Sequence, residues 1–134
     1  MTNEQSRTSR IRELNDQFRQ EMPHGRVIVT HGVSKFSNDQ LGEITQAIRS
    51  FDAFESNEDL LDEHDADTLE YEGVKLCWMI DACGEYRAFK FPAPTDKTVT
   101  RRFLVIMLGG EARALVIGMQ LTPWVPQAHE GAQA

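Results

Sequence analysis

The sequence predicts an α+β fold: an antiparallel or mixed sheet of about five strands with two helices on one face. Two early segments repeat apolar residues with the period of a helix, and most later segments alternate apolar and polar residues, as strands do. The chain has 134 residues, of which 40% are hydrophobic, which suits one small core. We therefore expect a single domain over residues 1–120 and a partly ordered tail over residues 121–134, which hold two prolines and no apolar period.

Two helices come first. The first is predicted over residues 5–21 and is stopped by Pro23. The second starts at Ser37, which forms a capping-box pattern with Gln40, and runs to about Phe51. Their core-facing residues are Ile11, Leu14 and Phe18 in the first helix, and Leu41, Ile44, Ile48 and Phe51 in the second.

The strands are predicted from alternation and from turn residues. We expect a strand over residues 26–32, a hairpin over 68–80 with Glu72-Gly73 at its turn, a strand over 86–91 after a turn at 81–85, and a central strand over 102–108. Residues 113–119 are a candidate for a sixth. In the hairpin, Val74, Leu76, Trp78 and Ile80 are expected to face the core. Trp124 lies outside the periodic segments, so we interpret it as a surface anchor for a partner or for a second copy of the chain, a homodimer.

Composition excludes several classes of protein. The longest apolar run, Phe103 to Leu108, is too short to cross a membrane, and the polar N-terminus lacks the apolar core of a signal peptide. A cytoplasmic protein with two free thiols, Cys77 and Cys83, is therefore expected. The net charge of −7 argues against direct nucleic-acid binding.

The stretch "DEHDAD" at residues 62–67 is the best candidate for a metal or catalytic site. It fails the calcium-loop pattern, because Ala66 and Asp67 stand where a ligand and a glycine are needed. We expect no metal and no cofactor. His64 could act as a base oriented by Asp65 or Asp81, but a structural His–Asp pair that holds the loop onto the sheet is the preferred interpretation.

The negative charge is concentrated in residues 52–72, which we call the acidic region. It contains ten carboxylates and no Lys or Arg, so the rest of the chain is slightly basic. Charge runs are usually solvated surface, but this density also resembles a phosphate track. The residues expected to bind a partner are Glu55, Glu58, Asp59, Asp62, Glu63, Asp65, Asp67, Glu70 and Glu72.

Several motifs resemble those of the domain-of-unknown-function 3768 family over roughly residues 10–112. They are "IRELNDQFR", "FDAF", His64-Asp65, the Trp78-x-Ile80-Asp81 element and Arg102 before Ile106-Met107-Leu108. The resemblance implies a small alphaproteobacterial protein of plasmids and other mobile elements, but it implies no activity.

From the charge and this resemblance we expect a non-enzymatic inhibitor or adaptor, of the anti-CRISPR or antirestriction type. Its acidic face would occupy the basic, nucleic-acid-binding cleft of a host defence protein. The alternative is a small hydrolase or ligand-binding domain centred on His64, Asp65 and Asp81.

Overall fold

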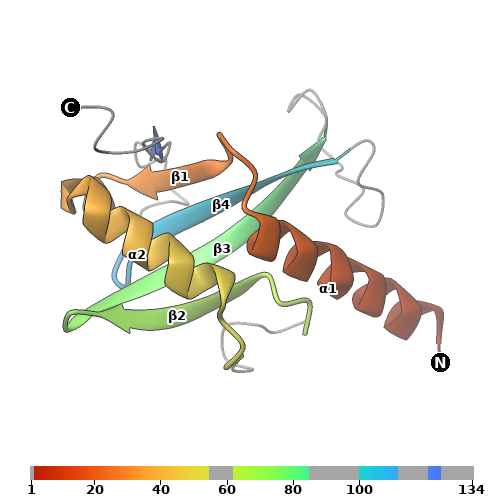
Figure 1. The fold of residues 1–134 in the computed structure, drawn as a ribbon. Helices are drawn as coiled ribbons and strands as arrows, with labels where there is room; N and C mark the ends of the chain where they lie inside the picture. Colours follow the sequence, from red (N-terminus) through yellow and green to blue (C-terminus); the bar gives the residue numbers. More distant parts are fainter. Residues whose placement is uncertain (1, 55–61, 85–99, 112–120, 125–134) are drawn as a thin grey trace.

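Two helices pack on one face of a mixed five-stranded sheet (Figure 1). The computed structural model describes residues 2–54, 62–84, 100–111 and 121–124. The sheet order is β2-β3-β4-β1-β5. β1 and β4 run parallel, and the other neighbouring pairs are antiparallel. The predicted α+β class, with a mixed sheet, is confirmed.

Both helices begin at capping boxes. In α1 (Asn3–Glu21), Thr2 caps the first turn together with Gln5, and the left-handed Met22 ends the helix. In α2 (Asn38–Arg49), the predicted Ser37–Gln40 box is present. The apolar stripes are buried as expected: Ile11, Leu14 and Phe18 in α1, and Leu41, Ile44 and Ile48 in α2. A short 3-10 turn, η1 (Val33–Lys35), links β1 (Val27–Thr30) to α2.

The predicted hairpin joins β2 (Ala66–Tyr71) to β3 (Val74–Gly84). Glu72 and Gly73 both have positive φ, 49° and 82°, as two-residue hairpin turns of the primed type require. Leu76, Trp78 and Ile80 are buried as expected. Val74 lies on the same face as Leu76 and opposite Tyr71, but it is 36% exposed because it lies beside the turn. Its predicted face is therefore correct, but Val74 is not part of the buried core.

The turn predicted at residues 81–85 is also wrong, since β3 continues to Gly84. Its last residues pair with β4 (Thr100–Leu108), from Asp81 opposite Phe103 to Gly84 opposite Thr100. The long partner strand extends the ladder through a segment whose composition favours a turn. The strands predicted at 86–91 and 113–119 lie outside the described residues.

The last described strand, β5 (Leu121–Trp124), falls where we expected a tail. It pairs antiparallel with β1, and its Pro123 is tolerated because β5 is an edge strand of this sheet. Trp124 is 9% exposed and its Nε1 donates to Asn38 Oδ1 at 3.1 Å. The interpretation of Trp124 as a surface anchor is therefore wrong: it packs against the core and ties β5 to the start of α2.

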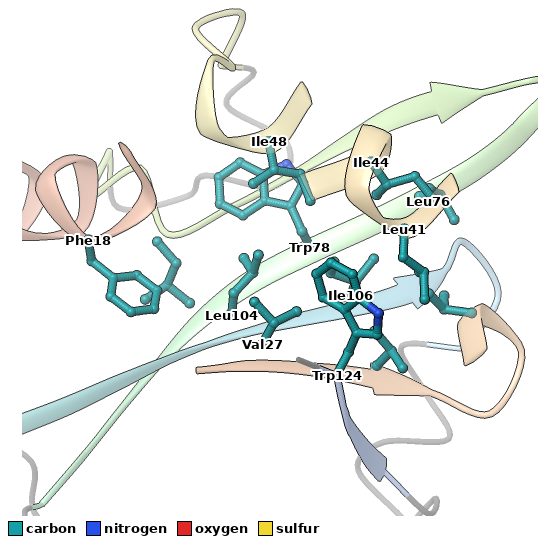
Figure 2. Packing of buried hydrophobic residues seen from close by; sticks show 13 residues of the cluster. Phe18, Val27, Leu41, Ile44, Ile48, Leu76, Trp78, Leu104, Ile106 and Trp124 are labelled. Carbon is teal, nitrogen blue, oxygen red and sulfur yellow. The ribbon is translucent and has the colours of Figure 1, made fainter. Parts of the chain in front are cut away.

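The core lies between the helices and the facing side of the sheet (Figure 2). Trp78 points from β3 towards Ile48 of α2, and Trp124 reaches the same cluster from β5, near Ile106 and Leu41. Among the described residues, no helix has the length and apolar character needed to span a membrane.

Candidate functional site

Phe54 and His64 are in contact and so bring together the two ends of the central part of the acidic region. The rings of Phe54 and His64 stack with centroids 3.8 Å apart and planes at 3°. Between them lie residues 55–63, here called the anchored segment, which carry five carboxylates. Asp62 and His64 adopt left-handed backbone conformations, with φ of 58° and 56°. Such conformations are costly for residues other than glycine unless the surroundings fix them.

Helix α1 supplies those surroundings. Arg12 donates from Nε to the carbonyl of Asp62 at 2.8 Å and from Nη2 to its carboxylate at 2.9 Å. Asn15 Nδ2 donates to the carbonyl of Glu63 at 3.0 Å. His64 Nδ1 lies 2.9 Å from Asp16 Oδ1. Three consecutive residues of the acidic region are thus fastened to one face of α1.

Arg19 continues that face one turn further and is buried, at 3% exposure. Its guanidinium donates to Asp16 at 2.8 Å and to the carbonyls of Ile48 and Phe51 at 3.1 and 3.2 Å. These carbonyls lie at the C-terminal end of α2, where a cation is favoured. Arg19 therefore joins α1 to the end of α2, next to the start of the acidic region.

An aromatic cluster lies beside the guanidinium of Arg19. Phe51, Phe54 and Trp78 meet edge to face, with centroids 5.0–6.0 Å apart. The guanidinium carbon of Arg19 lies 5.1 Å from the Phe54 centroid and 5.8 Å from that of Trp78, within the range of a cation–π interaction. Trp78 Nε1 is buried and has no hydrogen-bond partner in the described part of the chain.

A second buried arginine meets α1 from the sheet. Arg102 of β4 donates from Nε to Asn15 Oδ1 at 2.7 Å, so Asn15 bridges Glu63 and Arg102. Burial lowers the pKa of Arg102, as does the charge of Arg10, while Glu63 opposes the shift. The hydrogen bond from Arg102 to Asn15 therefore places a cation near the C-terminal end of the anchored segment.

The acidic residues selected from the sequence do not form one continuous face. Asp67 is 1% exposed, so its assignment to a partner surface is wrong: alternation along β2 turns it towards the helices, opposite Trp78. Glu63 and Asp65 are half-buried, and Asp62 and Glu70 are exposed. Glu72 is exposed in the hairpin turn and accepts from Gln40. Glu55, Glu58 and Asp59 lie outside the described residues.

The grouping of His64 with Asp65 or Asp81 stays a prediction. Asp16 Oδ1 lies 2.9 Å from His64 Nδ1 and Asp62 Oδ1 lies 3.9 Å from its Nε2, while Asp81 is exposed on the face of β3 opposite to buried Ile80. No group of three or more His, Cys, Asp or Glu side chains in the described ranges is arranged to hold a metal ion. Cys77 is half-buried in β3.

Sequence reasoning missed Arg12, Asn15, Asp16 and Arg19. Their spacing was a usable signal, because positions i, i+3, i+4 and i+7 form one stripe of a helix. Placed beside the apolar stripe of the same helix, this polar stripe indicates contact with another part of the chain.

The comparisons with known proteins agree with the motifs. No curated protein and no solved structure matches the chain. A family model described as "Protein of unknown function (DUF3768)" matches residues 29–111. The match includes His64, Trp78 and Arg102 and begins after α1. On this match over more than half its length, the chain belongs to the DUF3768 family.

Proposed function

We propose that this protein is a non-enzymatic binding protein that presents the anchored segment, residues 55–63, to a basic cleft of a protein partner. The observation that carries the proposal is the Phe54–His64 stack, which joins the two ends of a segment with five carboxylates. The contacts of α1 with Asp62, Glu63 and His64 fix one of those ends.

This arrangement suits recognition by charge. Fixing the ends of a segment in advance lowers the entropy that it loses on binding. A concentrated negative charge speeds encounter with a positive cleft and excludes partners of like charge. Asp67 is buried and Glu72 lies apart in the hairpin turn, and residues 55–63 carry five of the ten carboxylates of the acidic region.

Basic clefts with this charge preference are typical of proteins that bind nucleic acid. We therefore propose that the partner is a nucleic-acid-processing protein, such as a nuclease of a host defence system, and that the protein inhibits or recruits it. In that form the protein would act as an anti-CRISPR or antirestriction factor by occupying the path of the phosphates.

The test is co-purification from the native host, followed by binding kinetics at a low and a high salt concentration. The variant replaces Glu55, Glu58 and Asp59 with Gln, Gln and Asn. Its control makes the same charge change at exposed helical positions: Glu4→Gln, Glu13→Gln and Asp39→Asn. We expect the first variant to associate more slowly and to lose most of the salt dependence, while the control behaves nearly as wild type. Equal association rates for both variants would refute the proposal.

A hydrolytic or ligand-binding role around His64 is the second candidate. The observation that favours it is the hydrogen bond between His64 and Asp16, the geometry by which a carboxylate orients an imidazole base. That role would use Asp16 where we expected Asp65 or Asp81. Turnover of ester or phosphoester substrates that is abolished by Asp16→Asn would support it. Turnover that the variant retains would reject it.

A further inference from the structure

A cavity of about 200 Å³ lies beside the C-terminal half of α1, where the chain enters β1 and β4. Its apolar wall consists of Leu14, Phe18 and Pro23, and its polar lining includes Arg26 and Arg102. No residue of the anchored segment lines it, although Arg102 also donates to Asn15, which contacts Glu63. Since a water molecule takes about 30 Å³ of liquid volume, the cavity suits a compound of only a few heavy atoms.

Positive charge is concentrated at this cavity. Arg26 donates from Nη1 to the carbonyl of Arg102 at 3.3 Å, and its guanidinium carbon lies 5.6 Å from the Phe103 centroid. Burial and the charge of Arg101 both lower the pKa of Arg26. Among the described residues, no carboxylate forms an ion pair with Arg26. Crowded cations of this kind are stabilised by an anion.

We propose that this cavity binds a small apolar monocarboxylate, with its carboxylate on Arg26 and Arg102 and its hydrocarbon part against Leu14 and Phe18. The planar guanidinium matches a carboxylate in two parallel hydrogen bonds. The apolar wall favours an acid with a short hydrocarbon chain over a purely polar anion.

The charges at the rim select against a dianion. Glu21 lines the cavity and accepts from Gln17 at 3.2 Å. The C-terminal end of α1 adds the negative end of the helix dipole. A doubly charged phosphate would be repelled by both, whereas a monocarboxylate carries half that charge and can direct its apolar end towards α1.

The test is a titration of the labelled full chain by NMR, with butyrate as the probe. We expect the backbone amides of Gln17, Glu21 and Arg26 to shift with a saturable dependence on butyrate. Butanol, which lacks the charge, and inorganic phosphate, which lacks the apolar part, should bind at least about ten-fold more weakly, the value of one charged hydrogen bond. A short peptide with a C-terminal valine acid, compared with its amide, distinguishes a protein C-terminus from a free acid as the source of the carboxylate.

The variant Arg26→Gln should lower butyrate affinity about ten-fold or more. Arg7→Gln removes one exposed positive charge from the start of α1 and should leave the affinity unchanged. Arg26 is half-buried just before β1, so its replacement could disturb the fold. A native amide spectrum of the variant shows that the fold is intact. Butyrate shifts that are absent, that are equal in both variants, or that phosphate reproduces with higher affinity would overturn the proposal.

Discussion

Gly32 packs so closely against Leu108 that the site has no room for a methyl group. A Cβ at Gly32 would lie 2.5 Å from Leu108 Cδ1 and 2.7 Å from Glu111 Oε2. Glu111 cannot move away freely, because it accepts hydrogen bonds from the backbone of Gly32, from the backbone of Leu108 and from the buried hydroxyl of Thr30. The turn after β4 is thereby fastened to the turn after β1.

Gly32→Ala should therefore destabilise the protein by about 1–3 kcal/mol, as overpacking does. The matched control is Gly42→Ala in α2, where a Cβ would meet nothing within 4 Å. That change should stabilise the helix by up to about 1 kcal/mol. Urea denaturation of the two variants checks the prediction, and a stabilised Gly32→Ala protein would contradict the packing.

Trp78→Ala should cost about 3–5 kcal/mol of unfolding free energy, because a fully buried aromatic side chain leaves a large cavity. Trp78 is 1% exposed and contacts Phe51 and Phe54. The neighbouring Met79 is 36% exposed on the other face of β3, so Met79→Ala should change the free energy by about 0.5 kcal/mol. Similar urea midpoints for the two variants would show that the strand register is wrong.

Arg19→Met should destabilise the protein by about 1.5–3 kcal/mol, the value of hydrogen bonds to a charged group. The methionine retains the length of the buried stem but loses the donors to Ile48, Phe51 and Asp16. Arg49→Met is the control, since exposed Arg49 makes one hydrogen bond within the described part of the chain, to the carbonyl of Gln20 at 3.1 Å. If both variants unfold at the same urea concentration, Arg19 does not hold α1 against the end of α2.

Stability should fall above about pH 10, the ordinary pKa of tyrosine, in part because of Tyr71. Its hydroxyl donates to Glu43, and this hydrogen bond, with burial and the charges of Glu43 and Glu72, raises the pKa of Tyr71 in the folded protein. A raised pKa means that the folded state retains a proton that the unfolded state loses, so unfolding becomes easier as pH rises through this range. Tyr71→Phe should reduce the decrease measured by urea titration between neutral and alkaline pH. An unchanged decrease would show that other groups cause it.

The local patterns of this sequence predicted most of the fold. The Ser37–Gln40 box and the alternation of Leu76, Trp78 and Ile80 depend on neighbours a few residues apart, and the structure confirms them. The length of β3 and the existence of β5 depend instead on partner strands far along the chain. Pairing with β4 carries β3 to Gly84, and pairing with β1 fixes Leu121–Trp124 despite Pro123.

The candidate site was predicted less well, for the same reason. His64 was identified, but its hydrogen bond to Asp16, 48 residues earlier in α1, was not. Asn15, which connects Glu63 to Arg102, is an ordinary polar residue in the sequence. Its role appears only when α1, the acidic region and β4 are brought together.

The stack of Phe54 on His64 has a consequence for how the protein can diversify. A segment whose ends are already joined adds little entropy cost when it lengthens, about 0.6 kcal/mol for each doubling. Insertions and substitutions in residues 55–61, before the contacts of Asp62 and Glu63 with α1, should therefore leave the sheet and helices intact. Replacing a few residues of this segment therefore changes the surface that a partner meets. The folding of the rest of the chain is unchanged by such a replacement.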